Sequence, residues 1–176
     1  SVGEKVWPDH ASAPGSDKVR LHAVRIVSDG AVTSDIEIDK EILIEIEFWN
    51  MQPDANITTS IHLLDQMGVG VLASLNAHSA NLIEDDWFGK PHIPGLYKTS
   101  CTIPANFLNE GRYSINVILL ININDPEIYN KEVLSFTVYE TGEMRKEYTG
   151  YWLGVVRPRL AWNTQLLRGG IEEISA

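Results

Sequence analysis

Polar and apolar residues alternate along much of this chain, as they do in β-strands that bury one face and expose the other. The clearest run is Glu41–Trp49, where isoleucine and phenylalanine occupy every second position and acidic residues occupy most of the others. A slip in the alternation near Val24 predicts a β-bulge in an earlier strand. The other strands predicted from this pattern are Lys18–Ser28, Asp35–Asp39, Asn56–Asp65, Val69–Ser74, Tyr97–Ile103, Arg112–Asn122 and Glu132–Tyr139.

Turn residues separate these strands, and helical periodicity is almost absent. Asp29-Gly30 predicts a tight turn, and Gly68 predicts a hairpin between its two flanking strands. Pro104–Asn109 is compatible with one short helical turn. About eight short strands joined by turns predict an all-β fold, namely an antiparallel β-sandwich of the immunoglobulin-like or jelly-roll type.

The length and the polar segments predict one domain with two attached ends. A chain of 176 residues can bury roughly 70% of its unfolded surface in a single core. We expect an extended lead-in at residues 1–17, the sandwich at 18–140 and a polar linker at 141–152. A separate strand is expected at 153–162 and a tail at 163–176. Because the chain begins without methionine, we expect it to be a piece of a longer protein.

The segment Gly150–Trp162 is apolar and favours a strand, but Pro158 interrupts it. A proline cannot donate to a β-ladder and is confined to edge positions. Apolar residues such as Leu160 and Trp162 are costly to leave in water. The segment therefore needs a docking surface, either on an edge of its own domain or on another copy of the chain.

Charge and cysteine content narrow the possible partners. The chain has 24 acidic and 14 basic residues, a net charge of −10, which disfavours binding to nucleic acid and to anionic lipid. The single cysteine, Cys101, cannot form an internal disulfide and favours a reducing compartment. The N-terminus has no signal-peptide pattern, and no apolar run approaches the roughly 20 residues of a membrane helix.

Catalytic and cofactor motifs are not found. The sequence contains neither a GxxxxGK[ST] loop nor GxGxxG, so nothing predicts a nucleotide site. We interpret Cys101 as a buried structural thiol, and the serines lie in no GxSxG context. A carboxylate pair for glycoside hydrolysis stays possible, although acidic residues are too abundant to single one out.

Residues 75–96 form a long segment without a convincing strand, and such a loop is usually functional or mobile. It contains His78, His92, Asp85 and Asp86, which are potential metal ligands. Their spacing matches no known metal motif, so a solvated acidic loop is favoured over a zinc or calcium site. We predict no metal and no other cofactor.

Some polar strand faces have the chemistry of a sugar site. Carboxylates and amides hydrogen-bond to hydroxyl groups, and aromatic rings pack on the apolar face of a pyranose. If one sheet gathers these residues, they form a carbohydrate-binding face; the alternative is the ordinary polar outer face of any sandwich. The candidate carbohydrate-binding residues are Glu45, Glu47, Trp49, His62, Asn116, Asn122 and Trp87.

Four stretches have the order and spacing of a known family. They are Trp7…Ala13-Pro14-Gly15…Val19-Arg20, the strand Glu41–Phe48, the series Pro94-Gly95-Leu96-Tyr97…Ile103-Pro104…Leu108…Gly111-Arg112-Tyr113, and the closing Gly154–Leu160. Through them the chain resembles, over roughly residues 5–162, the C-terminal domain of the ATP-binding subunit (Wzt type) of bacterial ABC exporters of O antigen and related polysaccharides.

The resemblance implies an immunoglobulin-like sandwich without catalytic activity, in the cytoplasm at the inner face of the cell membrane. It implies binding of a lipid-linked polysaccharide glycan at its non-reducing end, and a homodimer that exchanges its last strand. The ATPase domain of the same chain, before Ser1, and the membrane subunit of the exporter would be further partners. The resemblance does not assign the sugar-site residues. Similar domains occur on glycosyltransferases, so a dimerisation or regulatory module stays an alternative, and a glycan-modifying enzyme is a further one.

Overall fold

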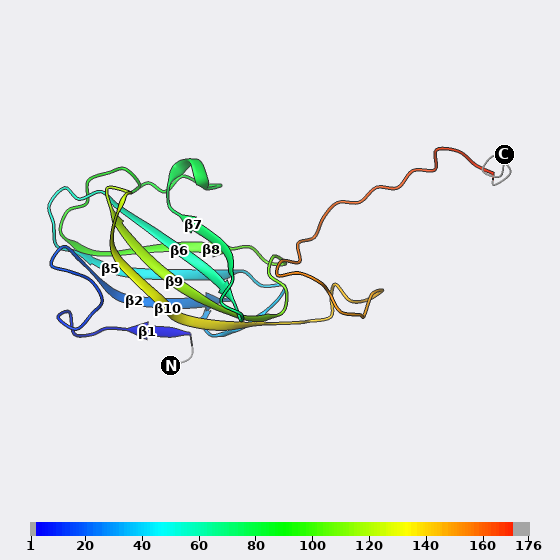
Figure 1. Ribbon diagram of the computed structural model, residues 1–176, viewed down its shortest axis with the longest axis horizontal. Coiled ribbons are helices and arrows are strands. Elements are labelled where there is room, and N and C mark those ends of the chain that lie inside the picture. The colour runs from blue at the N-terminus through cyan, green and yellow to red at the C-terminus, as the bar shows by residue number, and fades with distance from the viewer. Residues whose placement is uncertain (1–2, 171–176) are drawn as a thin grey trace.

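The computed structural model describes residues 3–170, and its strands form two facing sheets (Figure 1). Sheet I has the order β1-β2-β5-β8, with β3 paired to β2; sheet II has the order β4-β10-β9-β6-β7. Of the described strand pairs, β4–β10 is parallel and the others are antiparallel. The strands of sheet I are β1 (Glu4–Val6), β2 (Val19–Ser28), β3 (Ala31–Val32), β5 (Ile42–Asn50) and β8 (Gly95–Ile103). Those of sheet II are β4 (Asp35–Glu37), β6 (Ile57–Asp65), β7 (Gly70–Leu75), β9 (Gly111–Ile121) and β10 (Asp125–Tyr139).

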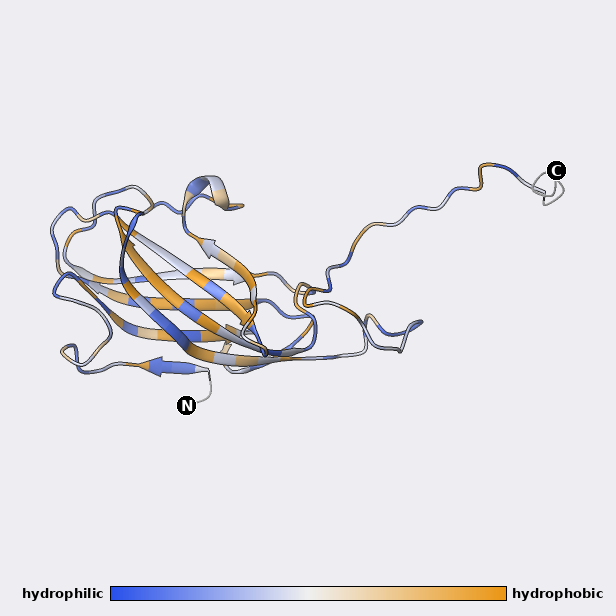
Figure 2. Cartoon of the chain, in the orientation of Figure 1, coloured by the Kyte–Doolittle hydropathy of each residue, from blue (hydrophilic) through white to orange (hydrophobic). Residues whose placement is uncertain are grey.

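The predicted all-β sandwich is confirmed, and its core lies between the two sheets. Along β5 every second residue, from Ile42 to Phe48, is buried, while the residues between them are half-buried on the outer face. The opposing inner face of sheet II contributes Ile61, Ile115 and Phe136 among others. The same alternation of apolar and polar positions is visible along the strands in Figure 2. Each such side chain contributes roughly 1.5–3 kcal/mol by leaving water.

The predicted irregularity in the first long strand is confirmed. The pairing of β2 with β5 shifts register between Leu21 and Ala23, just before Val24. Because of this bulge, Ala23 and Val24 are both buried although they are adjacent. A bulge of this kind resets which face of the strand each later side chain occupies.

The helical turn predicted at Pro104–Asn109 is wrong. Asn106 has a φ of 55°, in the left-handed region that a right-handed helical turn excludes. Its N–H donates to the carbonyl oxygen of Ile38 at 2.9 Å, so the segment is tied to the end of sheet II instead. The described residues contain one short 3₁₀ turn, η1 (His78–Ala80), in the long loop after β7. No helix among the described residues is long and apolar enough to cross a membrane.

After β10 the chain first returns to its own sandwich and then leaves it. The N–H of Asn109 donates to the carbonyl oxygen of Val155 at 2.9 Å, and the N–H of Arg157 donates to that of Phe107 at 2.7 Å. From Pro158 onward the described chain forms no strand and runs away from the domain (Figure 1). We call residues 158–170 the C-terminal arm. Exchange of a strand at 153–162 stays a prediction.

Candidate functional site

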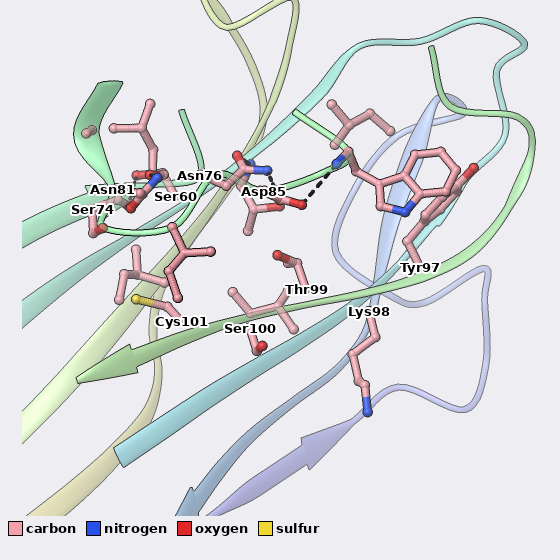
Figure 3. A pocket seen from close by; sticks show the side chains of 18 of the residues that line it. Ser60, Ser74, Asn76, Asn81, Asp85, Tyr97, Lys98, Thr99, Ser100 and Cys101 are labelled. Carbon is pink, nitrogen blue, oxygen red and sulfur yellow. Dashed lines mark hydrogen bonds between the residues drawn. The ribbon is translucent and has the colours of Figure 1, made fainter. Parts of the chain in front are cut away.

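A groove of about 600 Å³ opens along one side of the sandwich, where the two sheets end. One wall is β8, the edge of sheet I, and the other is β7 with the loop that follows it. Figure 3 shows side chains from both walls turned toward the space between them. Among the described residues, β8 and β7 each have a neighbouring strand on one side only, so the sandwich is left open here.

The floor of the groove is apolar. It is formed by Ile46 and Phe48 of β5 and by Ile57 and Ile61 of β6, which all belong to the core and are only 2–3% exposed. Cys101 of β8 also lines it and is half-buried. Burial raises the pKa of the Cys101 thiol, so the neutral form is favoured and the residue lacks the character of an activated nucleophile.

The polar rim is held in a fixed arrangement by Asn76 and Asp85. Asn76 Nδ2 donates to Asp85 Oδ2 at 2.8 Å, and Asn76 Oδ1 accepts the backbone N–H of Thr59 at 3.0 Å (Figure 3). Asp85 Oδ1 accepts the backbone N–H of Trp87 at 3.0 Å. His78 Nε2 lies 2.8 Å from the carbonyl oxygen of Asp85. These contacts tie the loop to β6 and orient one amide and one carboxylate along the groove.

Aromatic side chains close one end of the groove. The rings of Trp87 and Tyr97 meet edge to face with centroids 5.3 Å apart. The centroid of the His92 ring lies 5.1 Å from that of Trp87. The Tyr97 hydroxyl donates to the carbonyl oxygen of Ile93 at 2.7 Å, which fixes the tyrosine ring. Trp87 remains 47% exposed, so part of its indole surface is available to a ligand.

The seven sequence-predicted sugar-site residues lie on three separate surfaces. Glu45, Glu47 and Trp49 are on β5 of sheet I. They lie on its outer face, because the residues that alternate with them are buried in the core. His62 and Asn116 are on the outer face of sheet II, where they are cross-strand partners, and Asn122 follows the end of β9. Trp87 lines the groove. The single face on which these residues were expected to gather therefore does not form.

The predicted residues of sheet I are engaged with their neighbours. Glu47 Oε1 accepts from Arg25 Nη1 at 2.8 Å, and Glu45 Oε1 lies 3.9 Å from Lys98 Nζ. The Trp49 ring meets those of His10 and His22 edge to face, with ring centroids 6.1 and 6.0 Å away. The outer face of sheet I is therefore a charged surface on which these side chains already contact one another.

The predicted residues of sheet II also have local partners. His62 Nδ1 lies 3.1 Å from the Tyr129 hydroxyl. Asn116 is buried, and its Oδ1 accepts the backbone N–H of Glu132 at 2.8 Å, next to a break in the register of β10 against β9. Asn116 therefore supports an irregular strand and has little surface to offer a ligand.

Sequence reasoning missed most of the groove. Asn76, Tyr97 and Thr99 were not candidates, and Asp85 was considered only as a metal ligand. The signals that could have found them were the unusual length of the 75–96 loop and its aromatic content. These residues come together only because β7 and β8 are edge strands of opposite sheets, and a local sequence pattern cannot predict this arrangement.

A comparison with solved structures shows the fold. The crystal structure of the C-terminal domain of Wzt matches with a TM-score of 0.66 and 11% sequence identity, covering 92% of this chain and 89% of that chain. A putative β-galactosidase from Bacteroides fragilis matches with a TM-score of 0.38 and 14% identity, over 70% of this chain and 16% of that chain. A β-glucosidase from Listeria innocua matches with a TM-score of 0.35 and 10% identity, over 65% of this chain and 16% of that chain. The two glycosidase likenesses are too weak to support an argument.

No family model and no curated protein matches the sequence. The likeness to the Wzt domain extends over nearly the whole of both chains, so it includes both sheets and their connections. This chain therefore has the fold of the C-terminal domain of Wzt.

Proposed function

We propose that this chain is a non-catalytic glycan-binding domain of a bacterial polysaccharide exporter. The observation that carries the proposal is the groove between β7 and β8, which combines a fixed amide and carboxylate with an exposed indole. A pyranose presents hydroxyl groups at its rim and an apolar patch on its ring face. Asn76 and Asp85 suit the hydroxyl groups, and Trp87 suits the ring face.

The fold and the sequence resemblance supply the biological setting. A domain like that of Wzt would extend from an ATPase domain into the cytoplasm, at the inner face of the membrane, next to the membrane subunit of the exporter. There it would bind the lipid-linked O-antigen glycan, at its non-reducing end, and couple it to export. In the alternative setting, the sandwich would bind glycan through the same groove but would be attached to a glycosyltransferase domain instead of an ATPase domain.

A second function, dimerisation, is favoured by the C-terminal arm. Leu160, Trp162 and Leu166 are 73%, 89% and 86% exposed, and their spacing would place them on one side of the arm if it formed a strand. Large apolar side chains in such a row are expected to be covered by a partner. We propose that the arm pairs with an edge strand of a second copy, with β8 as the receiving edge because it is the longer of the two groove edges.

Titration of the chain with the polysaccharide, its non-reducing end intact, tests the glycan proposal. We expect saturable binding by calorimetry, weakened about tenfold or more by Trp87→Ala. Tyr129→Ala is the matched control, because this aromatic residue is 51% exposed on the outer face of sheet II. Equal losses in both variants, or no binding by the unaltered chain, would contradict the groove as the site.

The enzyme alternative is tested with the same material. A glycan-modifying enzyme would convert the polymer during incubation, whereas a binding domain returns it unchanged. Mass spectrometry of the recovered glycan distinguishes the two outcomes. Turnover that is lost in Asp85→Asn would replace the binding proposal with a catalytic one.

A further inference from the structure

We infer that the groove selects an uncharged sugar that carries a methyl-bearing substituent, such as a 6-deoxyhexose or an N-acetylhexosamine. The inference rests on the proposed function and names the class of sugar that the same groove would bind. Two independent features carry it. One is the sign of the charges that face the groove, and the other is the exposed apolar part of its lining, Leu82 and Ile83.

The charged groups of the groove walls are mostly acidic. Glu84 and Asp85 both line it, on the loop between β7 and β8. Lys98 also lines it, but Figure 3 shows its side chain directed away from the other labelled residues, and its Nζ lies 3.9 Å from Glu45 on the outer face of sheet I. The Nδ1 atom of His92 is turned to the backbone carbonyl oxygen of Lys90, at 2.9 Å.

An anionic sugar in this groove would therefore meet a carboxylate that no cation of the described residues 3–170 faces. The Asp85 carboxylate accepts hydrogen bonds from two neutral donors, the Asn76 amide and the backbone N–H of Trp87. Two like charges about 4 Å apart repel enough to weaken binding by at least about fivefold, and more where water is excluded. Uronic acid, sulfated and phosphorylated sugars are disfavoured for this reason.

The apolar part of the lining favours a substituent that carries a methyl group. The core residues at the floor, Ile46, Phe48, Ile57 and Ile61, are 2–3% exposed, whereas Leu82 and Ile83 of the lining are 104% and 85% exposed and present apolar surface to a ligand. A hydroxymethyl group directed at this surface would lose hydrogen bonds to water without replacing them. A C6 methyl group or the methyl of an acetamido group would instead leave water, which in a pocket of this kind strengthens binding by about tenfold.

A panel of methyl glycosides tests the inference on the complete chain. The panel compares rhamnose, fucose and N-acetylglucosamine with glucose, glucuronic acid and glucose 6-phosphate, by ligand-observed NMR and calorimetry at low salt. We expect at least one methyl-bearing neutral sugar to bind about tenfold more tightly than glucose. We expect the two anionic sugars to bind at least about fivefold more weakly than glucose.

Charge reversal next to the groove supplies a matched pair of variants. Glu84 lines the groove, whereas its exposed neighbour Asp86 does not. Glu84→Lys should strengthen glucuronic acid binding about two- to fivefold at low salt, and Asp86→Lys should change it less. Neither position is buried, so both variants are expected to fold.

The outcomes separate this inference from the proposed function. If an anionic sugar binds more tightly than the neutral ones, the inference is wrong and the glycan-binding proposal stands. If the polysaccharide binds but no methyl-bearing sugar exceeds glucose, the inference is again wrong. If neither the panel nor the polysaccharide binds, the proposed function itself fails.

Discussion

Arg157 Nη2 lies 2.6 Å from Glu140 Oε2, and the arginine side chain is completely buried. The guanidinium group also stands over the Trp152 ring, 5.0 Å from its centroid. Glu140 directly follows β10, and Arg157 is the last residue before the C-terminal arm. This ion pair therefore fixes the point at which the arm leaves the domain.

Removing either partner should destabilise the sandwich, by different amounts. Glu140→Gln would leave the buried Arg157 charge without its carboxylate, and we expect a loss of about 3–5 kcal/mol in the free energy of unfolding. Arg157→Met removes the charge and keeps the aliphatic stem, so a loss of about 1–3 kcal/mol is expected. Urea denaturation measures both, with the exposed Arg159→Met as control within about 0.5 kcal/mol. Equal effects from Glu140→Gln and Arg159→Met would contradict the role of the pair.

Stability should fall in acid because of the same carboxylate. Burial alone raises the pKa of Glu140, but hydrogen bonds from Arg145, the Gly142 N–H and Arg157 outweigh it and lower the pKa from 4.5 to about 2. A carboxylate with a depressed pKa in the folded state stabilises the fold above its unfolded pKa. That contribution, at most about 3 kcal/mol, is lost as the pH falls from about 4.5 to 2.

A second carboxylate acts in the same direction. Hydrogen bonds from Lys18 and Ser16 lower the pKa of Glu127, which joins the lead-in to β10.

Unfolding measured at pH 6.5, 4.5 and 3 tests the contribution of Glu140. The stability advantage of the unaltered chain over Glu140→Gln should shrink toward acid pH. An advantage that stays constant across this range would overturn the assignment to Glu140.

The local pattern predicted the fold well because it depends on which face of each strand is buried. The alternation in β5 and the slip near Val24 report burial directly, so the core strands and the bulge could be read from them. The turn at Asn106 depends on a left-handed backbone and a contact with Ile38, which no periodicity encodes. Parallel pairing of β4 with β10 is likewise a property of the tertiary arrangement.

The site was predicted much less completely, for a related reason. Period-two alternation shows that Glu45 and His62 lie on outer faces, but it cannot show that β5 and β6 belong to opposite sheets. Only Trp87 among the predicted sugar residues lines the groove. Asn76 and Asp85 become neighbours only when that loop folds back over β6.

Asn116 should prove structural although its residue type suggests a ligand. Its Oδ1 accepts the N–H of Glu132, which has a φ of 49°, at the irregular part of β10. Asn116→Ala would leave that N–H without its partner, and we expect a loss of about 1–3 kcal/mol in the free energy of unfolding. Glycan binding in the groove should be unchanged, as should the stability of the Ser114→Ala control, to within about 0.5 kcal/mol. Loss of glycan affinity in a folded Asn116→Ala chain would move the site to sheet II.

Truncation after Arg157 separates dimerisation from glycan binding. It removes the exposed arm, with Leu160 and Trp162, but keeps the ion pair with Glu140 and the backbone hydrogen bonds to Phe107 and Asn109. The fold should therefore survive, with the free energy of unfolding of the monomer changed by less than about 1 kcal/mol. Light scattering should give a dimer for the complete chain and a monomer for the truncated one.

The substitution Trp162→Asp provides the same test without shortening the chain. It places a charge in the middle of the apolar row, where pairing with a second copy would bury it, so the dimer should weaken by at least about a hundredfold. Asn163→Asp, on the other side of the extended chain, adds the same charge and is the matched control. A complete chain that is monomeric at every concentration would remove the strand exchange from the proposal. The groove, which is built within one chain, would still bind glycan.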